Sequence, residues 1–294
     1  MNKNKLAETN LYTGIDTIEV KSDTEINVDA APDFAPKYVK KDSNTGRCFY
    51  KLNTDKGAGT EIYNSADYYA MRDYMIELLQ MTNPVKVRID FRVDSFDDNF
   101  EELLKLNKLL IMLIGEQYKV KNEYYSINPR TLEELCVRIQ NDRIEVENYN
   151  KGIEEPDGIV KNRLEFRSKK LYDDTAENSK ELTEFLKWCN RLDKSVTKQN
   201  FEKLQQVLND ALYRQYQKEC NRRGFKVNEF LYKYQSSIFT SKQCADLYRR
   251  FGYKNPETQA KMYKQRKHIE YFSYRDLLTY TQMIKDSGER FFDC

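Results

Sequence analysis

Histidine is the residue that this sequence most conspicuously lacks. Only His268 occurs among 294 residues, which excludes paired-histidine metal sites, histidine-rich zinc sites and HExxH proteases. The chain also contains neither a GxxxxGK[ST] loop nor a GxGxxG turn, so the fingerprints of P-loop and dinucleotide-binding proteins are absent. An enzyme built from this sequence must therefore use carboxylates, tyrosine, cysteine, lysine or arginine.

Long apolar runs and paired cysteines are missing as well. The longest strongly apolar run, LLIMLI at residues 109–114, is far too short to span a bilayer. The first residues hold no apolar segment of signal-peptide type. The six cysteines are scattered, and none forms a CxxC pair. These features are typical of a cytoplasmic protein with reduced thiols and no membrane partner.

Excess charge of one sign is also missing. The 49 lysines and arginines nearly balance the 47 aspartates and glutamates, which leaves a net charge of +2. Any contact with nucleic acid must therefore come from local segregation of charge. At 39% hydrophobic residues, the chain is long enough for one large domain or two modest ones.

Hydrophobic periodicity predicts an α+β protein. We expect an antiparallel sheet with helices on one face, followed by a mostly helical C-terminal region, with the boundary near residues 171–181. The two predicted domains are residues 1–175 and 176–294. Expected strands lie at 16–20, 47–52, 59–64, 85–94, 136–140, 143–150 and 158–169. The strands 47–52 and 59–64 are expected to flank a turn at 55–59. Expected helices lie at 66–81, which ends before Pro84, and at 97–115, which ends at Gly115. Asn141-Asp142 is the expected turn of a hairpin.

Three of these strands are predicted to carry one apolar and one polar face, because side chains alternate along a strand. In residues 85–94, the valines, Ile89 and Phe91 share the apolar face. The polar faces carry Lys86, Arg88, Asp90, Arg92 and Asp94; Arg143, Glu145, Glu147 and Tyr149; and Arg163, Glu165 and Arg167. An antiparallel sheet with one solvated face has this pattern.

The polar face has two interpretations. Charged sheet faces commonly carry exposed ion pairs that contribute little to stability. Alternatively, Asp90, Asp94 and Glu165 supply the hard oxygen ligands that Mg²⁺ or Mn²⁺ prefers, without any histidine. Neighbouring arginines, Arg88 among them, would then hold phosphate, and a nearby tyrosine would be a candidate nucleophile. Carboxylates, tyrosine and arginine on one open sheet are the components of a DNA-nicking site.

Three segments in this order resemble a known family. They are VRIDFRVDSFDD at 87–98, YNK at 149–151 and NRLEFRSKKL at 162–171. In these segments the chain resembles the rolling-circle replication initiators of Gram-positive plasmids and the related relaxases of integrative conjugative elements. The resemblance implies an HUH-type endonuclease sheet of the branch whose metal site is built from carboxylates, since a histidine pair is absent. One departure is the acidic GIEEPDG at 152–158, where a basic loop is expected.

The resemblance also implies roles for individual residues. Tyr149 would attack the scissile phosphate and keep the 5′ phosphate, assisted by Lys151 or Arg167. Asp90, Asp94 and Glu165 would hold Mg²⁺ or Mn²⁺. Implied partners are double- and single-stranded origin DNA, a host helicase and a second copy of the chain. Tyr124 and Tyr125 compete with Tyr149, whereas Tyr68 and Tyr69 are expected to pack.

The C-terminal part resembles a helix-turn-helix segment at residues 240–278. Thr240 is expected to cap one helix, Gly252 to end it, and residues 256–258 to open the next. That second helix carries Lys261, Lys264, Arg266, Lys267 and His268, whose charges suit a contact with DNA phosphates or the major groove. The alternative is a basic surface helix of an ordinary bundle, with His268 on its surface. Trp188 is expected in the core.

We favour the first of three alternative functions, a cytoplasmic and metal-dependent initiator. A plasmid replication initiator that nicks its origin is the first, and a conjugative relaxase with the same chemistry is the second. The third is a DNA-binding regulator without catalysis, in which the charged sheet face would be structural.

Overall fold

The structure is a computed structural model. In it the chain forms two compact units. A sheet unit comprises residues 9–98, 120–191 and 282–294, and a helical unit comprises residues 1–8, 99–119 and 192–281. The predicted boundary between residues 175 and 176 does not coincide with this division, because each unit is assembled from segments far apart in the chain. The structure describes residues 6, 9–26, 38–96, 100–120, 122–127, 134–154, 158–171, 179–226, 229–231, 241–267 and 272–293.

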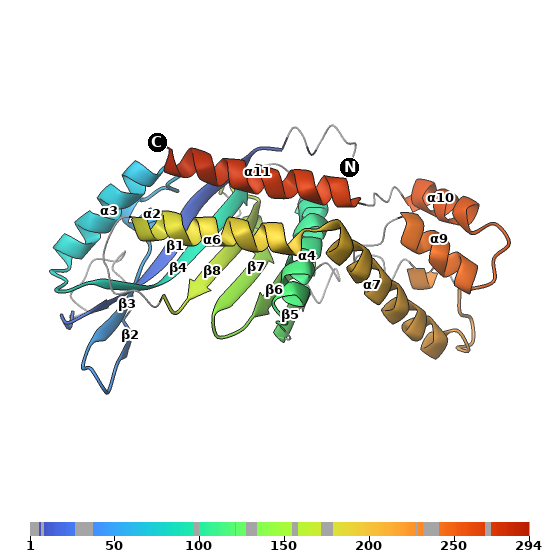
Figure 1. Cartoon of the computed structure of the whole chain (residues 1–294), viewed down its shortest axis with the longest axis horizontal. Coiled ribbons are helices and arrows are strands. Elements are labelled where there is room, and N and C mark those ends of the chain that lie inside the picture. Colours follow the sequence, from blue (N-terminus) through green and yellow to red (C-terminus); the bar gives the residue numbers. More distant parts are fainter. Residues whose placement is uncertain are drawn as a thin grey trace. The chain divides into compact units, whose positions relative to one another are not determined.

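One sheet of eight strands forms the body of the sheet unit (Figure 1). Its order is β2-β3-β1-β4-β8-β7-β6-β5, and every neighbouring pair is antiparallel, which confirms the predicted sheet type. The strands are β1 (Leu11–Ser22), β2 (Tyr38–Lys41), β3 (Cys48–Leu52), β4 (Val85–Ser95), β5 (Asn122–Ile127), β6 (Glu134–Gln140), β7 (Ile144–Tyr149) and β8 (Asn162–Lys169).

The apolar face of the sheet is covered by two long helices. These are α6 (Ser179–Ser195) and the C-terminal part of α11 (Tyr274–Phe292) (Figure 1). The ring centroids of Phe91 and Phe185 lie 5.7 Å apart, and those of Phe166 and Trp188 lie 5.0 Å apart. Trp188 also donates from Nε1 to Ser168 Oγ at 2.9 Å. The period-two alternation therefore predicted the buried face correctly, and Trp188 is a core residue as expected.

Lys86 is an exception to that alternation. The pairing of β1 with β4 is irregular here, since Glu19 lies opposite Arg88 whereas Val20 lies opposite Lys86. A bulge of this kind shifts the following side chain to the other face. The Lys86 ammonium is 2.8 Å from both carboxylate oxygens of the fully buried Glu181 of α6. The prediction that Lys86 shares the polar face was therefore wrong.

The segment after β3 differs from the expected hairpin. Residues expected as a turn form the short helix α2 (Thr54–Ala58), because Asn53 caps it by accepting a hydrogen bond from the Lys56 amide. Residues 59–64 are not a strand, and α3 (Ser65–Leu78) follows them. Arg92, on the polar face of β4, pairs with Asp55 of α2 and with Glu61. Helices therefore do not lie on one face only.

Other expected elements occur at or near their predicted positions. Strands β6 and β7 form the predicted hairpin, in which Asn141 Oδ1 accepts from the amides of Arg143 and Ile144 at 2.8 Å. A short helix, α5 (Lys151–Glu154), links β7 towards β8. Helix α4 (Phe100–Gln117) continues through Gly115, which is therefore not its end.

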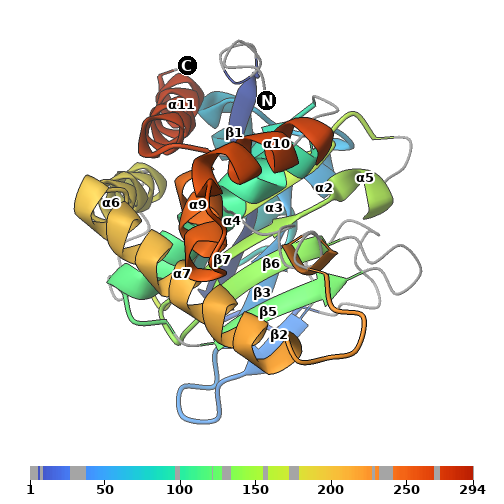
Figure 2. The ribbon, with the colours of Figure 1, turned by 90° about the vertical axis from the view of Figure 1, so that its right-hand side faces the viewer.

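The helical unit confirms the prediction of a largely helical C-terminal region. Its helices α7 (Lys198–Glu219), α9 (Ser241–Arg250) and α10 (Pro256–Lys267) share one core (Figure 2). Gly252 follows α9 with a φ of 78°, a left-handed conformation that glycine adopts at helix ends. The core residues are Leu212, Phe230, Leu231, Cys244, Ala245, Leu247, Tyr248, Ala260 and Tyr263. Within the described ranges, none of the helices combines the length and apolarity that a membrane crossing requires.

Candidate active site

The face of the sheet opposite α6 and α11 carries a dense set of charged side chains, called here the charged face. Strand register places Asp94, Arg163 and Tyr149 in one row across β4, β8 and β7, with Tyr12 of β1 opposite Asp94. The next rows bring Arg92 beside Glu165 and Asp90 beside Arg167. Each arginine therefore faces a carboxylate on the neighbouring strand, and antiparallel pairing alone sets this arrangement.

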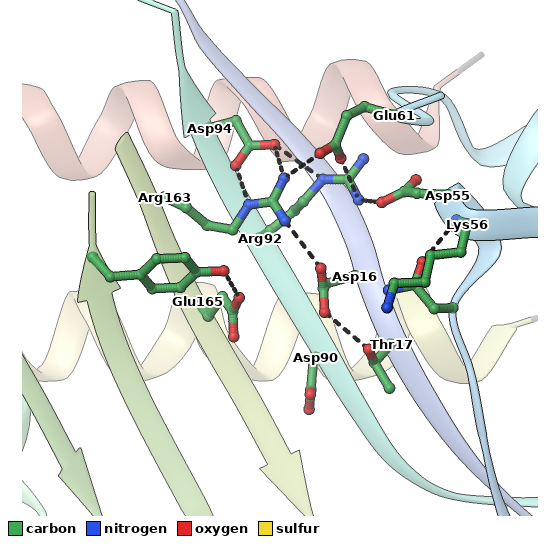
Figure 3. Close-up of polar contacts among 12 residues, drawn as sticks. Asp16, Thr17, Asp55, Lys56, Glu61, Asp90, Arg92, Asp94, Arg163 and Glu165 are labelled. Carbon is green, nitrogen blue, oxygen red and sulfur yellow. Dashed lines mark hydrogen bonds and ion pairs between the residues drawn. The ribbon is translucent and has the colours of Figure 1, made fainter. Parts of the chain in front are cut away.

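Asp94 is the centre of the first group of ion pairs (Figure 3). Arg163 donates from Nε and Nη2 to its two carboxylate oxygens at 2.6 and 2.9 Å, and Arg92 Nε lies 3.0 Å from Oδ2. Asp94 and Arg92 have no exposed side-chain surface, and Arg163 has almost none. Arg163 also donates to Asp16 at 3.0 Å and to Glu61 at 2.8 Å. The group is therefore a buried lattice and not a solvated face.

Two backbone features shape this group. Asp16 is an extra residue in β1, since Ile15 lies opposite Phe91 but Thr17 lies opposite Asp90; such a bulge leaves Asp16 and Thr17 together on the charged face, where Thr17 Oγ1 donates to Asp16 at 2.8 Å. Gly14 lies opposite Arg92, and a Cβ there would come within 2.8 Å of both Arg92 Nη2 and the carbonyl oxygen of Ile62. Only glycine leaves room for the Arg92 guanidinium.

Arg167 organises a second group, two rows from Asp94. Its Nε donates to Glu165 Oε2 at 2.8 Å, and it also pairs with Glu145 and Glu147. Asp90 is held mainly by Arg88, which donates from Nε and Nη2 at 2.7 and 2.6 Å. Burial raises the pKa of Asp90, although Arg88 and then Arg167 oppose the shift.

Tyr149 lies on the charged face, as the alternation predicted, and is half-buried. Its hydroxyl donates to Glu165 Oε1 at 2.6 Å. Burial, and then the negative charge of Glu165, raises the pKa of the Tyr149 phenol well above its ordinary value. Burial, followed by the nearby Asp16, raises the pKa of Glu165 to about 7. The phenol is therefore not ionised in advance, and its nearest proton acceptor is a carboxylate that titrates near neutral pH.

The three predicted metal ligands do not fit one shared ion. Asp90 and Asp94 are four residues apart on β4, which separates their Cα atoms by about 13 Å, whereas Mg²⁺ binds its oxygen ligands at about 2.1 Å. Each of the three, Glu165 included, is instead ion-paired with an arginine. Among the described residues, no group of three or more aspartate, glutamate, histidine or cysteine side chains is placed to hold a metal.

Among the described residues, the ion pairs of the charged face contain more carboxylates than cations. The cations in its ion pairs are Lys51, Arg88, Arg92, Arg138, Arg163, Arg167 and Lys169. The carboxylates are Asp16, Glu19, Asp55, Glu61, Asp90, Asp94, Glu145, Glu147 and Glu165. A phosphate that approaches this face therefore meets arginines whose charge is already matched.

Some of the other predicted site residues lie outside the rows just described. For others the structure describes only the backbone, or nothing. Lys151 is the first residue of α5, two positions after Tyr149. Lys261 is exposed on α10. Lys264, Arg266 and Lys267 belong to the same helix, but their side chains lie outside the described residues, as do those of Tyr124 and Tyr125 on β5. Thr240 and His268 are outside them altogether. Tyr68 is buried, as expected.

Sequence reasoning missed several members of the site. The alternation did place Arg92 and Arg163 on the polar face, but it gave no hint that both would be buried. Asp16 was assigned to a strand without its bulge. No pattern in the sequence connects Asp55, Glu61 or Tyr63 with this face, because they come from α2 and the segment that follows it.

The sequence and the structure were compared with known proteins. No family model and no curated protein matches the sequence. Among solved structures, a rolling circle replication initiator protein from Geobacillus stearothermophilus is similar over 54% of this chain and 75% of that chain, with 13% sequence identity and a TM-score of 0.32. A likeness of this size carries no argument about the fold or chemistry of this chain.

Proposed function

We propose that the chain is a rolling-circle replication initiator that nicks one strand of its origin through Tyr149. The observation that carries the proposal is the 2.6 Å hydrogen bond from the Tyr149 hydroxyl to Glu165. It joins two residues that the family resemblance singles out, Tyr149 before Asn150-Lys151 and Glu165 after Arg163-Leu164. A nucleophile whose base is within hydrogen-bonding reach is the usual arrangement for covalent catalysis.

The role proposed for Glu165 is that of general base and not of metal ligand. As Tyr149 Oη attacks phosphorus, a bond forms between phosphorus and the phenolic oxygen, and the bond from phosphorus to the 3′ oxygen breaks. The phenolic proton passes to Glu165 Oε1, and the departing 3′ oxygen takes a proton from water. The 5′ phosphate stays on Tyr149 and the 3′ hydroxyl is free for a polymerase.

Arg167 has a positioning role in this scheme. It pairs with Oε2 of Glu165, which leaves Oε1 directed to the tyrosine. Because Arg167 keeps partial side-chain exposure of 18% whereas Arg163 keeps 2%, Arg167 is the better placed of the two to reach a phosphate. The role of Mg²⁺ or Mn²⁺ stays a prediction of the resemblance, and no step of this scheme uses it.

The pH dependence of nicking tests the role of Glu165. The base must be deprotonated, so the rate should rise with pH and level off above about 7. Glu165→Gln keeps an acceptor oxygen for Tyr149 but cannot take its proton, and should lower the rate by about 100- to 10,000-fold and remove the inflection. The assay follows conversion of supercoiled plasmid carrying the DNA that flanks the coding sequence to protein-linked open circles.

Several outcomes of that assay are decisive. Wild-type rates for Glu165→Gln would remove Glu165 from the mechanism, and an absence of linked circles with the wild type would overturn the proposed function. Parallel reactions with EDTA, Mg²⁺ and Mn²⁺ measure the metal requirement.

The free energy of unfolding should change with pH in the opposite sense to activity. Because folding raises the pKa of Glu165, the contribution of Glu165 to stability is present at low pH and is lost as pH rises through about 7.

The helical unit is proposed to bind the origin through α10. Replacing Lys261, Lys264 and Lys267 together with alanine should weaken duplex binding and make it less sensitive to salt, because each lost phosphate contact reduces the slope of log affinity against log salt by about 0.9. Binding is measured by fluorescence anisotropy between about 50 and 200 mM salt. The matched control replaces three exposed lysines of α7, Lys198, Lys203 and Lys218. Equal slopes of log affinity against log salt for both triple variants would show that α10 is a surface helix without a specific DNA contact.

A second function is favoured by one observation. On the charged face the arginines are ion-paired with carboxylates, as expected if this lattice only holds the sheet together. The chain would then be a DNA-binding regulator, and the plasmid in the same assay would be shifted but intact. A conjugative relaxase would give the same linked circles as an initiator, and is separated from it by whether the plasmid then replicates or transfers.

A further inference from the structure

Three aromatic rings gather at the edge of the charged face. The rings of Tyr12 and Phe96 are stacked, with centroids 4.4 Å apart and planes inclined by 15°. Tyr63 meets both from the side, at 5.6 Å from Tyr12 and 5.8 Å from Phe96. Tyr12 is 36% exposed, so the cluster reaches the surface and is not a closed core.

The cluster is fixed to the ion-pair lattice beneath it. The Tyr63 hydroxyl donates to Asp94 Oδ2 at 3.2 Å, and the Arg92 guanidinium lies 5.1 Å from the centre of the Tyr63 ring. Tyr12 is directly opposite Asp94 across β1 and β4. A ring platform that is held in place by its neighbours loses little conformational freedom when a ligand binds.

The cluster and Tyr149 share one row of the sheet. The register runs from Tyr12 to Asp94, Arg163 and Tyr149 over four adjacent strands. Three steps of about 4.8 Å place the backbone of Tyr12 about 14 Å from that of Tyr149. A strand of DNA whose phosphate reaches Tyr149 therefore has neighbouring nucleotides within reach of these rings.

We propose that Tyr12 and Phe96 form a stacking site for a base of single-stranded DNA next to the scissile phosphate. The proposal rests on the proposed function, because it concerns the strand that Tyr149 attacks. Phosphates are poorly suited to this edge, because its described arginines, Arg92 and Arg163, are already ion-paired with carboxylates, whereas the face of a base is neutral. Stacking on an exposed aromatic ring binds any base and needs no charge. The rings would hold the strand through its bases, with the phosphates next to the stacked base turned to solvent and only the scissile phosphate at Tyr149.

The test measures binding of a fluorescent 12-residue oligothymidine to proteins that also carry Tyr149→Phe, so that no covalent product forms. Tyr12→Ala should weaken binding about tenfold, since one base–aromatic stack is worth about that much. Tyr12→Phe keeps the ring and should bind as the parent does. Tyr74→Ala removes a tyrosine of α3 that is more exposed than Tyr12, at 52% against 36%, and is the control. Trp188 fluorescence reports whether each variant keeps the fold of the sheet unit.

Two further measurements separate stacking from indirect effects. An oligonucleotide with abasic sites keeps every phosphate, so the loss caused by Tyr12→Ala should shrink on it. The salt dependence of binding should be the same with and without the ring, because stacking releases no counterions. A loss of equal size on the abasic strand, or no loss on oligothymidine, would overturn the stacking site while leaving the proposed function intact. A parent protein that binds no single strand would overturn both.

Discussion

Tyr149→Phe is expected to yield no covalent protein–DNA adduct, while the fold and the binding of duplex DNA survive. The substitution removes only the hydroxyl that donates to Glu165. Phenylalanine has no oxygen to attack phosphorus, so the loss should be complete rather than graded. Arg167 still pairs with Glu165, so that carboxylate keeps a partner, and the stability cost should stay within about 1–3 kcal/mol.

Mass spectrometry of a protease digest, made after reaction with single-stranded DNA from the nicked region, measures the adduct directly. Tyr68→Phe is the matched control, because it also removes a phenol that donates to a buried glutamate, Glu181 at 3.1 Å, but on the opposite face of the sheet. That variant should keep full adduct yield. An adduct on Tyr124 or Tyr125 would move the active site to β5 and refute the assignment of Tyr149.

Asp94→Asn should be among the most destabilising single changes in the sheet unit. Asp94 has no exposed surface, and it faces the guanidinium groups of both Arg92 and Arg163. Removing its negative charge takes one ion-pair partner from each of two buried arginines. Breaking a buried ion pair in this way costs about 3–5 kcal/mol, which is a large share of the stability of an ordinary domain.

Urea unfolding followed by the fluorescence of Trp188 measures this loss. Trp188 is the sole tryptophan and is buried against Phe166 in the sheet unit, so its signal reports on this unit. Asp23→Asn is the matched control, because Asp23 pairs with Arg47 at 2.7 Å but is 43% exposed, and exposed pairs contribute about 0–1 kcal/mol. Similar unfolding midpoints for the two variants would show that the lattice around Asp94 contributes little.

The sequence predicted the sheet better than it predicted the site. Alternation in β4, β7 and β8 reveals two faces, because side chains on a strand must alternate and one face must be apolar. It cannot reveal what covers the second face. Asp55 and Glu61 bury Arg92 and Arg163 only because Asn53 starts a helix where a turn was expected. The bulges left no sign in the sequence either, and they place Asp16 and Thr17 together on the charged face and turn Lys86 away from it.

The predicted metal ligands show the same limit. Composition led us to expect carboxylate ligands, but the type of residue says nothing about the spacing of the ligands. Asp90 and Asp94 lie on one extended strand, so their separation is fixed by backbone geometry before any side chain is placed. Glu165 lies in the row between them, opposite Arg92, and reaches Tyr149 instead. Pairing register, which depends on the whole sheet, determines which side chains Glu165 can contact.

The discontinuous build of the sheet unit sets an order for its folding during synthesis. Its apolar face is completed by residues 282–293, where Ser287 bonds Thr13 at 2.6 Å and Gly288 lets Phe185 approach the backbone closely. These residues leave the ribosome after all the strands and after the helical unit. A nascent chain that already displays every strand still lacks this cover, and its Phe185 side of the sheet is open to chaperones or to aggregation.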